Sequence, residues 1–150
     1  MKMKRKKIVF VCTGNTCRSP MAEALLRAEI KKRKIKWWDA TSRGINAEVG
    51  GTLSKNSELA LSEKDIVLPN FKPRQLTREL VAGSTLVVTM TEQQKEFLGN
   101  VGNVRCIKEF CGCDVPDPYG CGAEVYRLTR DILAFACEQI IENYILKYEE

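Results

Sequence analysis

The sequence predicts an α/β protein built on a parallel β-sheet with helices on both faces. Apolar, β-branched runs alternate along the chain with segments of helical periodicity, which is the pattern of strands joined by helical crossovers. The chain has 150 residues, of which 44% are hydrophobic, and neither a Pro/Gly/Ser-rich linker nor an internal repeat divides it. We therefore expect residues 1–150 to form one domain around one core.

The expected elements follow the order βαβ(αα)βαβα. Strands are predicted at residues 7–11, near 40–43, at 85–90 and at 103–107. Helices are predicted at residues 19–32, near 54–64 and 75–81, at 91–98 and from about 124 onward. Because folds of this kind bind ligands beyond the carboxyl ends of their strands, we look for a site in the segments that follow the strands.

The last helix has apolar residues at steps of three or four, which predicts one buried stripe. The stripe consists of Val125, Leu128, Ile132, Ala136, Ile140 and Tyr144. Cys137 lies on the same helix, and we expect Cys137 and Tyr144 to serve packing rather than chemistry.

The charge pattern and the N-terminal segment argue against several classes of protein. The net charge is +5, but basic residues gather in two runs, at residues 1–7 and 31–36, which we expect to be solvated ends. Nucleic acid is therefore not an expected partner. The apolar run at residues 8–11 is too short for a signal peptide or a membrane span, so we expect no membrane association and a cytoplasmic location.

The chain contains seven cysteines and no histidine. The lack of histidine rules out Ser-His-Asp and Cys-His catalysis, HExxH metalloenzymes and zinc deaminases. Proton transfer near neutral pH must then fall to Asp, Glu, Cys or Tyr. Because an odd number of cysteines in a reducing cytosol does not indicate a disulfide framework, catalysis, metal binding and packing are weighed for each thiol.

The segment "VCTGNTCRSP" joins the first strand to the first helix. Gly14 and Asn15 tolerate left-handed backbone, so the chain can curl and direct its N–H groups at an anion. Ser19 suits the helix cap, and Pro20 suits the first helical turn. Together with the guanidinium of Arg18, which binds two oxygens at once, the loop predicts a site for a tetrahedral oxyanion such as phosphate.

The same positive environment favours the thiolate of Cys12, so a nucleophile forms without a histidine base. A second Cys-x5-Arg match runs from Cys121 to Arg127, but it follows a loop rather than a strand. We therefore assign the functional pair to Cys12 and Arg18, against the alternative of a buried thiol and a surface arginine.

Two stretches of the chain resemble a known family. "VFVCTGNTCRSPMAEAL" and "DPYG" are similar to the signature and the general-acid loop of the low-molecular-weight protein tyrosine phosphatases. The resemblance covers nearly the whole chain and implies a flavodoxin-like three-layer sandwich with a four-stranded parallel sheet. It implies that Cys12 attacks phosphorus, and that Asp117 protonates the leaving group and then activates water to hydrolyse the phosphocysteine. Such a cycle acts on phosphorylated proteins and needs no cofactor and no metal.

Two aspartates compete for the acid role in the irregular segment at residues 109–123. Asp114 is three residues earlier than Asp117, but Pro116 and Pro118 bracket Asp117 and stiffen its backbone, so we favour Asp117. A carboxyl group that faces a thiolate and a bound phosphate dianion should hold its proton more tightly, as an acid must.

The resemblance implies further roles around the loop. Asn15 would hold the curled backbone, Ser19 would donate to the Cys12 sulfur, and Cys17 would form a disulfide with Cys12 on oxidation. The alternative for Cys17 is a small packed side chain. Tyr119 is expected to line the pocket, where it can stack on a phenyl ring or on a guanidinium. The expected substrate-binding residues are Thr13, Gly14, Asn15, Thr16, Cys17, Ser19 and Tyr119.

Position 16 should border the pocket mouth, where tyrosine-directed members of the family typically have a bulky aliphatic residue. This chain has Thr16 there and, with "VTMTEQQKEF" and "DPYGCGAEVYRLTRD", resembles the bacterial protein arginine phosphatase branch. A hydroxyl can hydrogen-bond a guanidinium, whereas an apolar wall suits a phenyl ring. We therefore expect phosphoarginine to be favoured, with phosphotyrosine close behind and inorganic phosphate or other oxyanions as ligands of the loop.

Two alternatives belong to other classes. An arsenate reductase of the same fold needs further cysteines that relay a disulfide, and residues 44–105 contain none. A non-enzymatic nucleic-acid-binding module would hold zinc at Cys106, Cys111, Cys113 and Cys121. Their gaps of four, one and seven residues lack a paired CxxC knuckle, so we expect packed or incidental thiols instead.

Overall fold

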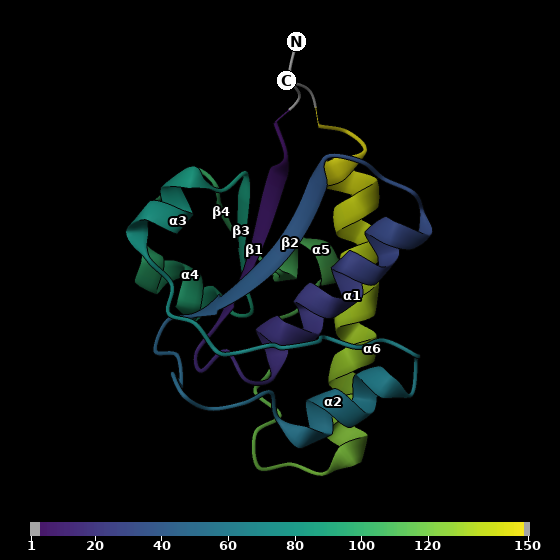
Figure 1. The fold of residues 1–150 in the computed structure, drawn as a ribbon. Helices are drawn as coiled ribbons and strands as arrows, with labels where there is room; N and C mark the ends of the chain where they lie inside the picture. Colours follow the sequence, from purple (N-terminus) through teal and green to yellow (C-terminus); the bar gives the residue numbers. More distant parts are fainter. Residues whose placement is uncertain (1–3, 149–150) are drawn as a thin grey trace.

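The structure, a computed structural model, describes residues 4–148 and centres on one parallel sheet (Figure 1). The strand order across the sheet is β2-β1-β3-β4, so the first strand lies between two neighbours. The strands are β1 (Lys6–Cys12), β2 (Trp38–Gly44), β3 (Leu86–Thr89) and β4 (Val104–Cys106). The predicted four-stranded parallel sheet is confirmed, with ends that differ from the expected ones by one or two residues.

Helices cover both faces of this sheet, as predicted. In Figure 1, α1 and α6 lie side by side across one face, and α3 and α4 lie on the other. The helices are α1 (Arg18–Lys32), α2 (Lys55–Ser62), α3 (Arg78–Gly83), α4 (Glu92–Leu98), α5 (Lys108–Cys111) and α6 (Ala123–Ile140), which continues as a π-helix over Ile141–Ile145. The strand order and the three layers are those of a flavodoxin-like sandwich. Within residues 4–148, no helix is long and apolar enough to cross a membrane.

Alternate residues of β1 supply the cores on the two sides of the sheet. Ile8 and Phe10 belong to the large core shared with α1 and α6, whereas Val9 and Val11 belong to a smaller core with residues of α3 and α4. All four side chains are fully buried. Because successive side chains of a strand point to opposite faces, a central strand covered on both sides needs this unbroken apolar run.

The ends of β1 and β2 are held together at the carboxyl edge of the sheet. Cys12 is the register partner of Gly44, and the N–H of Ile45 donates to the Cys12 carbonyl at 2.9 Å. A Cβ atom on Gly44 would lie 2.7 Å from the carbonyl oxygen of Thr13 and 3.0 Å from Ala47. Glycine therefore lets the segment after β2 pack directly against the loop after β1.

The helix expected at residues 75–81 begins later than predicted. Gln75 forms an isolated parallel bridge with Gly44, and the N–H of Leu76 donates to the Gly44 carbonyl at 2.9 Å, so this stretch pairs alongside the end of β2 instead. Thr77 then caps α3 with its side-chain oxygen. The partner that holds Gln75 extended is distant in the sequence, so local periodicity could not indicate it.

The buried stripe of α6 is shifted from the predicted one. Val125 is 41% exposed and Leu128 is 61% exposed, so the prediction that both are buried was wrong. The buried residues of α6 are Tyr126, Thr129, Arg130, Leu133, Ala136, Cys137 and Ile140. The expected packing of Cys137 is confirmed, and Tyr144 is half-buried and packs edge-on against Trp38 at 6.1 Å between ring centroids.

Polar contacts explain the shift in α6. The hydroxyl of Tyr126 lies 3.4 Å from the Cys17 sulfur, behind the loop that follows β1. The guanidinium of Arg130 donates to the Ala60 carbonyl and to the Glu63 carboxylate, both at 2.8 Å. A buried arginine with paired N–H groups is stable, but a pattern based on hydrophobicity assigns such a residue to the surface.

The choice of which face of α6 is buried can be tested by stability measurements. We expect Leu133→Ala to lower the free energy of unfolding by about 2–5 kcal/mol, because Leu133 is fully buried and its truncation leaves a cavity. Leu128→Ala is the matched control on the exposed face and should change it by less than about 0.5 kcal/mol. Denaturant titration of the wild type and the two variants measures both changes in the free energy of unfolding. Equal losses in the two variants would contradict the burial of Leu133 and the exposure of Leu128.

Candidate active site

The loop between β1 and α1 joins a buried cysteine to a buried arginine. Cys12 is the last residue of β1 and Arg18 is the first of α1, and both are at most 5% exposed. Asn15 has a positive φ of 60° and is completely buried, so the predicted left-handed turn falls at Asn15. The carboxyl end of the central strand and the beginning of a helix thus converge on one point of the sheet edge.

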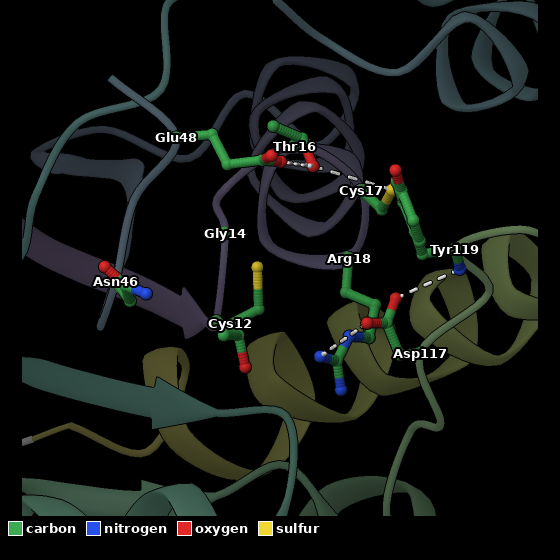
Figure 2. Close-up of a pocket in the computed structure, with 10 residues that line it drawn as sticks. Cys12, Gly14, Thr16, Cys17, Arg18, Asn46, Glu48, Asp117 and Tyr119 are labelled. Atoms are coloured by element: carbon green, nitrogen blue, oxygen red, sulfur yellow. Dashed lines mark hydrogen bonds and ion pairs between the residues drawn. The ribbon is translucent and has the colours of Figure 1, made fainter. Parts of the chain in front are cut away.

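A pocket of about 330 Å³ opens above this loop (Figure 2). Its lining residues are Cys12, Thr13, Gly14, Thr16, Cys17, Arg18, Asn46, Glu48, Asp117 and Tyr119. Eight of these ten were expected from the sequence, whereas the expected residues Asn15 and Ser19 do not line the pocket and lie behind it, fully buried. The predicted nucleophile, arginine and acid therefore meet in one cavity, although Asp117 lies about a hundred residues after the loop that carries Cys12 and Arg18.

The side chain of Asn15 ties the loop to β2 and to the segment before α3. Its amide nitrogen donates to the hydroxyls of Ser19 at 2.8 Å and Ser42 at 3.0 Å. Its amide oxygen accepts from the backbone N–H of Arg74 at 2.9 Å. Because the Arg74 N–H can only donate, it sets which end of the amide faces the two serines.

Ser19 does not cap α1, which corrects one expectation. The residue at the cap position is Cys17, and no side chain caps this helix end. The Ser19 hydroxyl instead lies 2.8 Å from the Cys12 sulfur. Because its oxygen accepts from Asn15, its proton is free to point at Cys12, and its other acceptor, the Arg43 carbonyl, is farther away at 3.5 Å.

The hydrogen-bonded chain behind the pocket ends at a buried carboxyl group. Ser42 donates to the Glu23 carboxyl at 2.7 Å, and Glu23 is only 3% exposed. Burial raises the pKa of Glu23, and the hydrogen bond from Ser42 and the charges of Arg27, Arg74 and Arg43 oppose that shift. Glu23 thus orients the Ser42 hydroxyl, which leaves the Ser42 oxygen free to accept from the Asn15 amide.

The guanidinium of Arg18 is held by the loop that carries the two aspartates. One nitrogen of Arg18 donates to the Val115 carbonyl at 2.9 Å, and another lies 3.8 Å from the Asp117 carboxylate. The N–H of Val115 in turn donates to the carbonyl of Met90 at 2.9 Å, just after β3. The position of Arg18 therefore depends on the loop after β4, here called the acid loop (residues 112–122).

The structure separates the two candidate acids. Asp117 lines the pocket, its side chain is 54% exposed, and it accepts from the N–H of Tyr119 at 3.1 Å. Asp114 accepts from the N–H of Glu92 at 3.1 Å and from the Cys106 thiol at 3.5 Å, and it does not line the pocket. These contacts occupy Asp114 in holding the loop, so Asp117 is the one of the two aspartates that faces the pocket.

Sequence reasoning missed two pocket residues, Asn46 and Glu48, which follow β2. The N–H of Glu48 donates to the Gly14 carbonyl at 3.0 Å, and its carboxylate lies 3.4 Å from the Thr16 hydroxyl. Figure 2 shows Thr16 and Glu48 together on one side of the pocket and Arg18 with Asp117 on another. Their position after the carboxyl end of a predicted strand is the signal that could have found them.

Cys17 lies between the pocket and the hydroxyl of Tyr126. Burial, and then the contact with Cys17, raise the pKa of Tyr126 to about 12. Tyr126 therefore keeps its proton at neutral pH and can donate it toward the Cys17 sulfur at 3.4 Å. Cys17 itself is 4% exposed, which agrees with the expectation of a small packed side chain.

The other cysteines do not form a metal cluster in the part of the chain that the structure describes. No group of three or more His, Cys, Asp or Glu side chains between residues 4 and 148 could hold a metal ion. Cys106 is buried, Cys111 is half-buried, and Cys113 and Cys121 are exposed. Packing therefore accounts for Cys106 but not for Cys113 or Cys121.

A cysteine that ends a strand, an arginine that begins the next helix and an aspartate that faces both across one pocket define a cysteine-dependent phosphatase of the α/β class. The family model described as low molecular weight phosphotyrosine protein phosphatase matches residues 7–149. The chain belongs to this family.

Three relatives show how close the similarity is. A protein-arginine-phosphatase from Bacillus subtilis (strain 168) is 39% identical over 144 residues, which cover 91% of this chain and 95% of the relative. The crystal structure of a low molecular weight protein tyrosine phosphatase from T. tengcongensis superposes with a TM-score of 0.86 at 36% identity, covering 91% and 98% of the two chains. A cysteine-to-serine mutant of the YwlE arginine phosphatase, with a phosphorylated active-site serine, gives a TM-score of 0.82 at 35% identity, covering 94% and 99%.

The buried carboxyl of Glu23 predicts a pH effect on stability. Because the pKa of Glu23 is raised in the folded protein, folding favours its protonated form and so stabilises the protein at low pH. This stabilisation is lost as the pH rises from the ordinary glutamate pKa of about 4.3 through the raised pKa of the folded protein. The free energy of unfolding of the wild type should therefore fall, relative to Glu23→Gln, across that window. Denaturant titrations at a series of pH values measure the difference, and Glu58→Gln, on the exposed side of α2, controls for the lost charge. Parallel wild-type and Glu23→Gln curves would contradict the raised pKa.

Proposed function

We propose that this chain is a protein-arginine phosphatase, which hydrolyses phosphorylated arginine side chains of proteins and phosphotyrosine less well. The observation that carries this proposal is the polar rim of the pocket, where the carboxylate of Glu48 and the hydroxyl of Thr16 lie 3.4 Å apart. The identity of 39% to a relative named protein-arginine-phosphatase supports the same substrate class.

In the proposed cycle, Arg18 and the loop amides bind the phosphoryl oxygens, and the Cys12 thiolate attacks phosphorus in line. Asp117 gives its proton to the departing nitrogen as the phosphorus–nitrogen bond breaks, and phosphocysteine forms. Asp117 then takes a proton from water, whose oxygen attacks phosphorus and releases phosphate and the thiolate. The hydroxyl of Ser19, at 2.8 Å, stabilises that thiolate as it leaves.

The rim favours a guanidinium over a phenyl ring for an electrostatic reason. The leaving group of phosphoarginine is cationic once released, and the carboxylates of Glu48 and Asp117 both border the pocket. A phenol gains nothing from these charges and would pack better on an aliphatic side chain than on the Thr16 hydroxyl. Tyr119 is 72% exposed beside the pocket and can stack on either group, so it supports neither substrate over the other.

Matched peptides that carry either phosphoarginine or phosphotyrosine test the substrate class. We expect the wild type to prefer phosphoarginine, and Thr16→Ile to shift the ratio of the two kcat/KM values toward phosphotyrosine by about tenfold or more. Glu48→Gln should lower kcat/KM for phosphoarginine alone, by about twofold to fivefold, because an exposed ion pair contributes up to about 1 kcal/mol. Cys12→Ser, which lacks the proposed nucleophile, is the negative control and should show no turnover. A wild-type preference for phosphotyrosine would overturn the proposed substrate, and turnover that survives in Cys12→Ser would overturn the mechanism.

The acid assignment has its own test in a pair of variants from one loop. Asp117→Asn should lower kcat for phosphopeptides by about a hundredfold to ten-thousandfold, since it cannot protonate the leaving group. Asp114→Asn keeps an oxygen that can accept from the Glu92 N–H, so it should retain most of the activity. Steady-state kinetics of both variants decides between them, and the reverse order of effects would assign the acid to Asp114.

A further inference from the structure

Two cysteines that the phosphatase cycle does not use lie one residue apart at the end of α5. Cys111 is the last residue of this helix, Gly112 has a positive φ of 86°, and Cys113 follows. The N–H of Gly112 donates to the Lys108 carbonyl at 2.8 Å and closes the helix. Glycine adopts this left-handed conformation without strain, so the chain reverses sharply between the two cysteines.

The reversal brings Cys113 back over the end of the helix. The Cys111 thiol donates to the carbonyl of Cys113 at 3.2 Å and to that of Ile107 at 3.4 Å. Two residues span at most about 7 Å when the chain is extended, and the turn at Gly112 shortens that span toward the roughly 4.4–6.8 Å between Cα atoms that a disulfide needs. Burial raises the pKa of the Cys111 thiol, and a backbone hydrogen bond with Cys113 opposes that shift.

The two thiols differ in access, which suggests an order of reaction. Cys113 is exposed to solvent, whereas Cys111 is half-buried and hydrogen-bonded. A reagent therefore reaches Cys113 first, and Cys111 stands next to it as the second thiol. Neither cysteine lines the pocket that contains Cys12 and Cys17, so this pair is a separate site.

We propose that Cys111 and Cys113 form a redox-active dithiol that low-molecular-weight disulfides oxidise to an intramolecular disulfide. The Cys113 thiolate attacks one sulfur of the reagent, whose S–S bond breaks and releases one thiol. The Cys111 thiolate then attacks the Cys113 sulfur and releases the second thiol. The dithiol loses two electrons and two protons, and the reagent disulfide is reduced to two thiols.

The position of the dithiol connects it to the arginine of the pocket. Directly after Cys113, Asp114 accepts from the N–H of Glu92, and Val115 donates to the carbonyl of Met90. The carbonyl of Val115 accepts from Arg18 at 2.9 Å. A disulfide between Cys111 and Cys113 draws Cys113 toward the end of α5. It therefore displaces the following residues, among them Val115, which holds Arg18, and the chain that leads to Asp117. Oxidation should therefore slow the enzyme reversibly.

The bond itself is tested in Cys12→Ser protein, which removes the nucleophile from the chemistry. After treatment with oxidised glutathione and alkylation, trypsin releases residues 109–127, which contain Cys111, Cys113 and Cys121. We expect this peptide to be two hydrogens lighter in Cys12→Ser, with Cys121 as its single alkylated thiol, and to be two hydrogens lighter with no alkylated thiol when Cys121→Ser is added. The change should be absent when Cys111→Ser or Cys113→Ser is added. A bond that persists with Cys111→Ser, or a peptide with every thiol alkylated, would overturn the proposal.

The effect on catalysis is measured separately, in the wild type. Inorganic phosphate at saturating concentration occupies the pocket during oxidation and is removed before the assay of a small aryl phosphate. Activity should fall by about tenfold or more, because the acid and the arginine both lose their positions, and should return on reduction. Cys113→Ser should resist this loss, while Cys121→Ser should behave as the wild type. An equal loss of activity in Cys113→Ser would assign the effect to Cys12 and overturn the link to the acid loop. The peptide analysis does not depend on activity, so its result stands whether or not the chain is a phosphatase.

Discussion

The buried amide of Asn15 is the contact on which the arrangement of the site depends. It joins the loop after β1 to Ser42 on β2 and to the backbone of Arg74, so three segments distant in sequence share one side chain. An amide with four hydrogen-bonding positions can do this from the left-handed conformation that the loop requires, and aspartate could not donate to the two serines. The same bonds leave the Ser19 proton directed at the Cys12 sulfur.

The other half of the site depends on the acid loop rather than on the sheet. Arg18 belongs to α1, but its guanidinium is held by the Val115 carbonyl, and Val115 is itself held by Met90 after β3. The proposed anion-binding arginine and the proposed acid Asp117 are therefore linked through one loop. The proposed oxidation at the end of α5 would act on the pocket through this link, since α5 itself contributes no residue to the pocket.

The family resemblance was strong at the loop because its chemistry uses residues that are neighbours in the chain. Cys12, Gly14 and Arg18 could be named from spacing and from flanking strand and helix signals, the acid loop was implied by the family resemblance, and the structure brings them into one pocket. The pocket rim was harder to predict, since Glu48 reaches it from the segment after β2. Nothing in the local sequence around Glu48 indicates that it lies beside Thr16.

The sequence by itself determined the sheet, the two helical layers, the strand that ends at Cys12 and the segment that supplies Asp117. The sheet and the helical layers follow from periodicity, and the two segments of the site follow from short motifs, that of Asp117 through the family resemblance, so none of them depends on distant contacts. Tertiary structure alone decided the stripe of α6 that is buried, the late start of α3, the chain from Glu23 to Cys12, and the approach of Cys111 to Cys113. The physical reason is that a buried polar side chain is stable only beside its partner, and those partners are set by the fold rather than by neighbouring residues.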